Sequence, residues 1–426
     1  MKAAQWREYL TGNASDGAFE RLYPGKAGEN RQRYLTLLDT YKKVFGADPD
    51  LALFSAPGRT EIGGNHTDHQ HGRVMAASVD MDTIAVAALT DEPVICVKSD
   101  GYPMCRVELD DLSAQADEVN STASLIRGVA AGFAKMGAGI GGFNAVVTSS
   151  VLPGSGISSS AAFEVLIGNI VNSFFYDNQA DAVKIAQISQ YAENEYFGKP
   201  SGLMDQMASS VGNILTIDFE DTEHPDVRRL DVDFAACGMA LVIIDSGASH
   251  ADLTDEYAAI PVEMKKISGY FGKEYLRQVP KEDVLAVIPQ LRHLAGDRAV
   301  LRALHFYSDN DRVPQQAQAL EQGDVRRFLD LVIESGVSSW TMLQNITPAG
   351  YIEHQEMGIV LALCEQLLKG KGAWRVHGGG FAGTVQAFVP ADELEHFTKT
   401  MDAMLGAPAC HVLSIRPVGG TQITAQ

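Results

Sequence analysis

At 426 residues the chain is longer than one hydrophobic core usually fills, so we expect two domains with a ligand-binding cleft between them. Its 46% hydrophobic and 21% charged residues are ordinary for a globular protein and exclude a disordered chain. A formal net charge of -20, without a basic patch, disfavours nucleic acid and anionic membranes as partners.

The cysteines and the first residues bear on the cellular compartment. The five cysteines include no C-x-x-C pair, which argues against a disulfide framework and against a thiolate zinc site. The N-terminal twenty residues lack the apolar core of a secretory signal, and no run of about 18 apolar residues occurs. We therefore expect a cytoplasmic protein that spans no membrane.

The predicted elements start with a pair of helices within residues 1–46, where apolar side chains recur at helical spacing. Short β-branched or alternating segments then predict strands at residues 51–58, 73–80, 83–90 and 94–100. The rest of the first half predicts, in order, a helix at 123–136, a strand at 143–151 and helices at 161–176, 181–197 and 203–211.

The second half is predicted to be mixed as well. Its pattern predicts strands at 213–221 and 238–247, a mainly helical stretch at 256–345, and a strand, a helix and a strand within 375–425. The polar segment DTEHPD lies between the two halves. We therefore expect one domain over residues 1–220 and a second over residues 221–426.

The stretch VLPGSGISSSAAFEVLIGN, residues 151–169, carries the clearest chemical signal. A strand ends, two glycines permit tight turns, three serines follow, and a helix begins. That order directs backbone N–H groups and a helix N-terminus at one place, which suits a phosphate group without a net positive charge. The stretch is neither a Walker A loop nor a dinucleotide fingerprint. A serine-capped helix after a turn is the alternative.

A second unusual stretch is GGNHTDHQHG, residues 63–72, with three histidines and an aspartate within six positions. Such side chains can chelate a metal ion, but a fourth ligand and supporting groups would have to come from elsewhere. Imidazole and carboxylate groups also supply the donors and acceptors that bind sugar hydroxyls. A polar surface loop without a ligand is the third alternative.

Several segments together resemble one family. P-G-S-G-I-S-S-S-A-A resembles the phosphate loop of the GHMP kinases, and RVHGGGFAGTVQAF resembles their C-terminal glycine-rich motif. SAPGRTEIGGNHTDH is similar to the signature of the galactokinases within that superfamily. AENEYFGKPSGLMDQMASSVG and SHADLTDEY resemble two further galactokinase segments. The matches occur in the family's order between residues 55 and 388, and the resemblance implies that the loop at 63–72 binds a sugar.

The resemblance implies an α+β, two-domain GHMP kinase fold. Its N-terminal domain would hold a mixed sheet with helices, its C-terminal domain would be ferredoxin-like, and the active site would lie in the cleft between them. The implied reaction is ATP-dependent phosphorylation of galactose at the C1 hydroxyl, with Mg²⁺, in a monomer or weak homodimer. A 1-kinase for N-acetylgalactosamine or arabinose is one alternative, and a non-catalytic galactose sensor is another.

The resemblance also implies a role for particular residues. Asp205 corresponds to the catalytic aspartate and Arg59 to the arginine that pairs with it. Magnesium would be held by Ser160 and Glu193, which offer hard oxygen ligands. The residues implied in sugar binding are Asn65, His66, Asp68, Gly202, Asp205 and Tyr257. Those implied in nucleotide binding are Pro153, Gly154, Ser155, Gly156, Ile157, Ser158, Ser159, Ser160 and Ala161.

The chain departs from the family pattern next to the sugar loop and on the adenine side, among other positions. Asn65 stands where a glutamate usually precedes the histidine, and the segment Thr60-Glu61-Ile62-Gly63 replaces the usual valine-asparagine-leucine-isoleucine. On the adenine side, Thr122 and Leu125 stand where many galactokinases have a tryptophan and a tyrosine. The identity of the sugar and the preferred nucleotide are therefore left open by the sequence.

Overall fold

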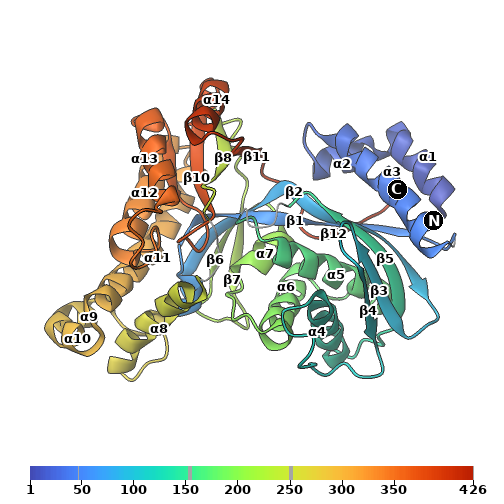
Figure 1. Cartoon of the computed structure of the whole chain (residues 1–426), viewed down its shortest axis with the longest axis horizontal. Coiled ribbons are helices and arrows are strands. Elements are labelled where there is room, and N and C mark those ends of the chain that lie inside the picture. Colours follow the sequence, from blue (N-terminus) through green and yellow to red (C-terminus); the bar gives the residue numbers. More distant parts are fainter. Residues whose placement is uncertain (47, 152–155, 249–252, 426) are drawn as a thin grey trace.

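The computed structural model describes residues 1–46, 48–151, 156–248 and 253–425, and it contains two β-sheets (Figure 1). One sheet has eight strands and both parallel and antiparallel pairs, and the other has four strands that pair only antiparallel. The predicted α+β architecture with a mixed N-terminal sheet is confirmed. None of the helices in the described ranges is both long and apolar enough to cross a membrane.

The eight-stranded sheet is built around two long strands. Its central order is β12-β1-β2-β5-β3-β4, with β6 and β7 attached to β2. The strands are β1 (Ala52–Gly63), β2 (Arg73–Thr90), β3 (Val94–Ser99), β4 (Met104–Glu108), β5 (Gly142–Ser149), β6 (Ile214–Asp218), β7 (Asp226–Leu230) and β12 (Thr421–Ile423). Residues 73–80 and 83–90, predicted as two strands, form the single strand β2, because pairing with β1 continues through Asp82.

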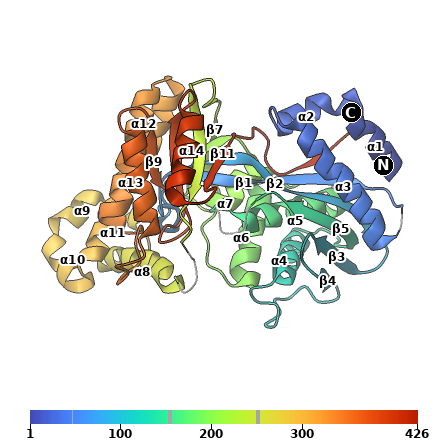
Figure 2. The ribbon, with the colours of Figure 1, turned by 45° about the horizontal axis from the view of Figure 1, so that its top comes forward.

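Helices cover both faces of this sheet (Figures 1 and 2). Alternate residues of β1 point to opposite faces, so Leu53 packs with the N-terminal helices whereas Phe54 packs with α4 and α5. The N-terminal helices are α1 (Ala3–Thr11), α2 (Asp16–Leu22) and α3 (Ala27–Phe45). The opposite face carries α4 (Thr122–Lys135), α5 (Ser159–Phe175), α6 (Ala182–Tyr191), the π-helix η3 (Ala192–Phe197) and α7 (Met204–Val211).

The predicted helix pair within residues 1–46 is therefore wrong in number. Gly12 ends α1 and is followed by a short 3-10 turn, η1 (Asn13–Ser15), before α2 begins. A second break follows α2, where Gly25 has a φ of 71°, a conformation that glycine adopts at little cost. The side chains of all three helices pack in the same hydrophobic cluster. The apolar spacing in the sequence therefore continues across both breaks and does not reveal them.

The second sheet has the order β11-β8-β10-β9, which is the 4-1-3-2 order of a ferredoxin-like domain when its strands are numbered along the chain. Its strands are β8 (Met239–Asp245), β9 (Ala373–Val376), β10 (Thr384–Pro390) and β11 (Cys410–Leu413). Its helices and turns are α8 (Thr254–Tyr270), η4 (Leu276–Gln278), α9 (Lys281–Ala286), α10 (Ile288–Ala295), α11 (Asp297–Glu321), α12 (Val325–Ser338), the π-helix η5 (Ser339–Leu343), α13 (Glu356–Leu368) and α14 (Leu394–Leu405).

The two sheets share a hydrophobic cluster. Ile62 and Met75 of the first sheet lie in the same cluster as Leu241 and Ile243 of the second, together with side chains of α11 and α12. The two lobes in Figure 1 are therefore joined by packed apolar side chains, and not only by the chain. The strand β1, fully buried along its length, runs from the first lobe into this junction.

The end of the chain returns to the first sheet. Strand β12 pairs antiparallel with β1 from Leu53 to Ser55, and β7 pairs with β6, although both follow residue 220. These strands, and β4, are short and were not singled out by the sequence pattern. The boundary between residues 220 and 221 stays a prediction, and both sheets draw strands from residues that follow it.

Candidate active site

An arginine and an aspartate from distant parts of the chain form the centre of the site. Arg59 lies on β1 and Asp205 lies in the first turn of α7. The guanidinium donates two hydrogen bonds to the carboxylate, from Nε to Oδ1 at 2.6 Å and from Nη2 to Oδ2 at 2.8 Å. This bidentate geometry fixes both side chains relative to each other. The predicted pairing is therefore present in the structure.

Several charges act on the Asp205 carboxylate. Burial acts to raise its pKa, but the Arg59 guanidinium, the Ser158 hydroxyl and the Lys199 ammonium oppose that effect. The net result is a pKa of Asp205 below its ordinary value. Asp205 is consequently an ionised carboxylate at neutral pH, held next to a permanently charged guanidinium.

Strand β1 also holds the glycine-serine loop in place through hydrogen bonds from Arg59. The N–H of Arg59 donates to the carbonyl of Ile157 at 3.0 Å, and its guanidinium Nη1 donates to the carbonyl of Gly156. A Cβ at Gly58 would lie 2.6 Å from the Ile157 side chain, so only glycine permits this approach. Of the predicted nucleotide-binding residues, Pro153, Gly154 and Ser155 lie outside the described residues.

The serines mark the start of α5. Ser158 has a left-handed conformation, with a φ of 57°, and its hydroxyl donates to Asp205. The 17-residue helix α5 then begins at Ser159, so the first N–H groups of the helix point out of its N-terminus close to Arg59 and Asp205. Ile157 and Ala161 are buried, so they would contact a nucleotide only through their backbones. This arrangement suits a phosphate group.

Ser160 and Glu193 form the pair predicted to bind magnesium. The Ser160 hydroxyl lies 3.2 Å from Oε1 of Glu193, which is buried in the π-helix η3. A hydroxyl and a carboxylate at this separation fit two neighbouring positions of an octahedral Mg²⁺ site, whose other ligands would be phosphate oxygens and water. Glu195, two residues later, is exposed. Single-turn π-helices are frequent at functional sites.

The sequence analysis missed a residue that holds Glu193 in place. Gln206 is fully buried, and its Nε2 donates to Glu193 at 2.8 Å and to Glu164 at 3.0 Å. Burial raises the pKa of Glu164 well above its ordinary value, and the negative Glu193 nearby adds to that effect. The signal in the sequence was the position of Gln206 directly after Asp205 in GLMDQ.

Two predicted sugar-binding residues, Asp68 and Gly202, lie close to Arg59. Asp68 belongs to the 3-10 turn η2 (Asp68–Gln70) and acts electrostatically on Arg59. A Cβ at Gly202 would lie 1.8 Å from Oδ2 of Asp68, so this glycine is required for the carboxylate to take its place. The predicted sugar residues Asp68, Gly202 and Asp205 are thus brought together.

His66 is neutral in this loop. Burial, and the neighbouring His69, lower the pKa of His66 to about 3. Its Nε2 lies 2.9 Å from the carbonyl of Gly379 and donates to it. Nδ1 then carries a lone pair and is available as an acceptor for a hydroxyl.

Two of the three histidines of the loop, His66 and His69, stack with their ring centroids 5.8 Å apart. His69 lies 3.9 Å from Asp68, and the ring of His71 stacks on Tyr275 with their centroids 3.7 Å apart. Across the described ranges, no group of three or more His, Cys, Asp or Glu side chains has the geometry to hold a metal ion. The loop at 63–72 is therefore a turn in which His66 and His69 stack on each other and His71 packs on Tyr275.

Asn65 is the centre of a buried polar network. Its Nδ2 donates to Glu61 at 2.9 Å and to the carbonyl of Gly378 at 2.7 Å. Its Oδ1 accepts hydrogen bonds from Ser339 and Asn345, at 3.1 and 2.9 Å. The side chain is fully buried and its amide has used its donors and acceptors. A sugar contact by Asn65 stays a prediction, and such a contact would have to replace one of these hydrogen bonds.

Glu61 has an unusual proton affinity in this network. Burial raises its pKa to about 7, although the guanidiniums of Arg375 and Arg59 and the amide of Asn65 lower it. Arg375 is itself fully buried, and its Nη2 donates to Glu61 at 2.5 Å. The carboxyl group is thus placed where the family pattern has an asparagine, four residues before Asn65.

The C-terminal glycine-rich motif accepts hydrogen bonds from the residues of this network. Gly378, Gly379 and Gly380 present their carbonyls to Asn65, His66 and Tyr257, respectively. Tyr257 donates its hydroxyl to Gly380 at 2.8 Å and packs edge-on against Phe381, and burial raises its pKa to about 12. The flanks of the motif reach the phosphate loop, since a Cβ at Gly156 would lie 2.7 Å from the Thr384 hydroxyl.

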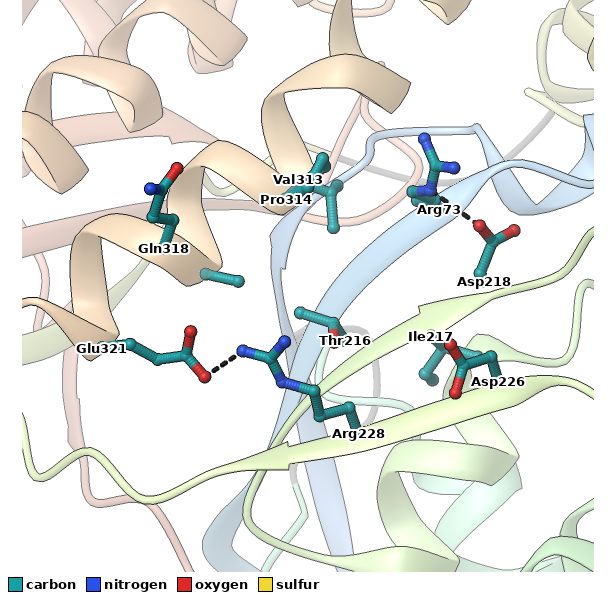
Figure 3. A pocket seen from close by; sticks show the side chains of 11 residues that line it. Arg73, Thr216, Ile217, Asp218, Asp226, Arg228, Val313, Pro314, Gln318 and Glu321 are labelled. Atoms are coloured by element: carbon teal, nitrogen blue, oxygen red, sulfur yellow. Dashed lines mark hydrogen bonds and ion pairs between the residues drawn. The ribbon is translucent and has the colours of Figure 1, made fainter.

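On the adenine side, Thr122 is exposed and Leu125 is buried at the start of α4. Arg127 makes a bidentate ion pair with Glu118, with distances of 2.6 and 2.7 Å. A separate cavity of about 480 Å³ lies between β6, β7 and α11, and Figure 3 shows its arginines paired with carboxylates. Of the described predicted site residues, none lines that cavity.

Comparisons with known proteins extend over most of the chain. It is 29% identical over 394 residues to a galactokinase of Streptomyces coelicolor, covering 91% of this chain and 97% of the relative. The solved structure of Lactococcus lactis galactokinase complexed with galactose is 23% identical, covers 92% of this chain and 100% of that chain, and superposes with a TM-score of 0.79. A mevalonate kinase of Methanococcus jannaschii shares the fold at 14% identity and a TM-score of 0.58, covering 85% and 98% of the two chains.

Two family models match the parts of the chain that form the site. The model described as the GHMP kinases N terminal domain matches residues 124–213, which contain the start of α5, Glu193 and Asp205. The chain belongs to the GHMP kinases. The model described as the galactokinase galactose-binding signature matches residues 39–89, which contain Arg59 and the sugar loop. Within the GHMP kinases, the chain belongs to the galactokinases.

Proposed function

We propose that the protein transfers the γ-phosphoryl group of ATP to the C1 hydroxyl of galactose, with Mg²⁺ as cofactor. The observation that carries this proposal is the position of the Arg59–Asp205 pair. It lies between the N-terminus of α5, which suits phosphate, and the sugar loop with Asp68 and Gly202. The galactokinase signature at residues 39–89 covers the loop side of this arrangement.

Asp205 is the group placed to take the proton of the sugar hydroxyl. The C1 oxygen forms a bond to the γ-phosphorus, the bond from that phosphorus to the bridging oxygen of ADP breaks, and the hydroxyl proton passes to Asp205. With its lowered pKa, Asp205 is a weak base, which is sufficient when proton transfer follows formation of a loose transition state. Arg59 keeps the carboxylate ionised and in position.

The other described residues bind the nucleotide. The N–H groups of Ser159, Ser160 and Ala161 at the start of α5 receive the phosphates, and Ser160 and Glu193 hold the metal ion. When bound, Mg²⁺ neutralises charge on the phosphate oxygens during transfer.

Asn65 motivates the alternative substrates N-acetylgalactosamine and arabinose. The glutamate usual at that position is replaced by an amide whose hydrogen bonds all go to protein groups. The protein therefore offers one carboxylate fewer to the sugar than the family pattern does. Galactose remains the proposed substrate, because Asp68 and Gly202 match the family and lie against each other close to Arg59.

The test is an ADP-release assay on the purified protein with ATP and Mg²⁺, against galactose, N-acetylgalactosamine, arabinose, glucose and mevalonate. We expect turnover on galactose to exceed that on the other compounds. Turnover highest on arabinose or N-acetylgalactosamine would replace galactose as the substrate. Galactose binding by calorimetry without turnover on any compound would instead support a galactose sensor. Sedimentation of the same sample tests the expected monomer or weak homodimer.

A further inference from the structure

Lys199 lies against the proposed magnesium ligand and has no role in the mechanism above. It follows Gly198, directly after the π-helix η3, and its backbone N–H donates to the carbonyl of Glu193 at 3.1 Å. Its ammonium Nζ donates to Oε1 of the same glutamate at 2.9 Å. These two hydrogen bonds hold the short segment between η3 and α7 against Glu193.

The Glu193 carboxylate has no free position for a further ligand. Oε1 accepts hydrogen bonds from Ser160 and Lys199, and Oε2 accepts them from Ser201 at 2.6 Å and Gln206 at 2.8 Å. A carboxylate offers about four lone-pair positions in total. Coordination of a metal ion by Glu193 therefore requires at least one of these donors to leave.

Of the four donors, Lys199 is the cation, and a metal ion at Oε1 of Glu193 would repel it. An ammonium has three donors and no lone pair, so it cannot share a metal ion with the carboxylate. The Ser160 hydroxyl can turn a lone pair toward the metal, and Gln206 is fully buried and also holds Glu164. The Lys199 side chain is 58% exposed, compared with 3% for Glu193, so it has room to move.

A displaced ammonium would remain among groups that bind phosphate. Lys199 already acts electrostatically on Asp205, to which the Ser158 hydroxyl at the start of α5 donates. When the nucleotide arrives, it adds negative phosphate oxygens to the same place. These oxygens would accept a charge-assisted hydrogen bond from the ammonium, in place of the one to the Glu193 carboxylate.

We propose that Lys199 neutralises Glu193 in the free enzyme and moves to a phosphate of the nucleotide when Glu193 coordinates the metal ion. This inference rests on the proposed function in that it takes Ser160 and Glu193 as the metal ligands. It makes Lys199 a further residue that contacts the substrate, as a cation beside the phosphoryl group. The resemblance to the family assigns no role to Lys199, whose side chain is exposed.

The test compares nucleotide binding with and without metal. Calorimetry would measure the affinity for AMP-PNP, a non-hydrolysable analogue of ATP, in Mg²⁺ and in EDTA. Because Lys199 would bond to a phosphate only after the metal has displaced it from Glu193, we expect Lys199→Met to weaken binding about 10- to 100-fold in Mg²⁺. The same substitution should change the affinity in EDTA much less, since Lys199 stays on Glu193 there.

Matched variants control for charge and for folding. Lys199→Arg keeps the positive charge and should retain part of the affinity in Mg²⁺. Lys369→Met removes an exposed lysine that pairs with Glu365 far along the chain, and it should bind AMP-PNP like the unmodified protein. If thermal melting shows that Lys199→Met does not fold, Lys199→Gln takes its place in the same comparison.

Two results would overturn the inference. One is an affinity in Mg²⁺ that Lys199→Met leaves unchanged. The other is an equal loss in Mg²⁺ and in EDTA, which would mean that Lys199 acts without any displacement. Both results are distinct from failure of the proposed function: an enzyme that phosphorylates none of the sugars can still show a metal-dependent effect of Lys199 on binding.

Discussion

The two sides of the site are built in different ways. On the phosphate side, Arg59, Ser158 and Asp205 contact one another directly, and the Asp205 side chain is 29% exposed and accessible to a substrate. On the side of the sugar loop, Asn65 and Glu61 are buried and bonded to the C-terminal motif. The first side presents groups to a ligand, whereas the second uses equally polar groups to hold the two lobes together.

This difference separates residues that carry chemistry from residues that position the chain. A charged pair whose carboxylate is partly exposed is available to reactants. A buried amide with all its hydrogen bonds made contributes to stability, and replacing it leaves other buried groups without partners. Substitutions on the first side should therefore change turnover, and substitutions on the second should mainly change stability.

The largest expected effect is that of Asp205→Asn on turnover. Because the amide cannot accept the hydroxyl proton, we expect kcat to fall about 10²- to 10⁴-fold. The affinity for AMP-PNP should stay nearly unchanged. Steady-state kinetics and calorimetry on the same sample measure both, with a melting curve to show that the protein is folded. Normal turnover in this variant would remove Asp205 from the mechanism and would break the contrast between the two sides.

On the buried side, Asn65→Glu should destabilise the protein. The new carboxyl would lie next to Glu61, about where the amide now donates at 2.9 Å. Loss of that hydrogen bond and the burial of a second acid should lower the free energy of unfolding by about 3 kcal/mol. Guanidinium denaturation measures the change, and Asn13→Glu on an exposed turn is the control.

The double variant Glu61→Asn, Asn65→Glu sharpens this test. It exchanges amide and carboxyl, and so keeps one of each beside Arg375. We expect it to recover most of the stability that Asn65→Glu loses. If the double variant also shifts the ranking among the sugars in the ADP-release assay, residue 65 contributes to substrate specificity. An unchanged ranking would limit this position to a structural role.

The pH dependence of stability should report on Glu61. Its pKa is about 7 in the folded protein, above the ordinary value of 4.5, so the folded state binds the extra proton between those values. Stability from this group should therefore fall as pH rises from about 4.5 to about 7, by up to about 3 kcal/mol. Denaturation across this range should show a flatter slope for Glu61→Gln. Equal slopes would mean that Glu61 is already ionised at low pH beside Arg375.

The smallest effect is expected for Tyr257→Phe. It removes the hydrogen bond to the carbonyl of Gly380 but keeps the ring packed on Phe381. We expect a loss of about 1 kcal/mol in unfolding free energy. Tyr102→Phe, at an exposed position, serves as the control and should change little. A large fall in kcat without a change in stability would move Tyr257 to the catalytic side of the comparison.

The sequence allowed much of this architecture to be predicted, for reasons that can be located in particular residues. The long apolar helix after the serines and the alternating strands have local periodicities that need no partner to be recognised. Arg59, Asp205, Ser160 and Glu193 were identified from motifs, and the structure brings them together as two pairs. The single long strand β2 and the short strands β4, β7 and β12 were not predicted, because pairing with neighbours determines where they begin and end.

By itself, the sequence determined the fold class and the family and singled out Arg59 and Asp205, since these depend on local patterns and on motifs in a fixed order. Only the tertiary structure decided what Asn65, Gln206 and Lys199 contact. Hydrogen bonds such as that from Asn65 to Gly378 join residues hundreds of positions apart. Tertiary packing decides whether a polar side chain is free to bind a ligand or already hydrogen-bonds to other protein groups. A local sequence pattern does not contain that information.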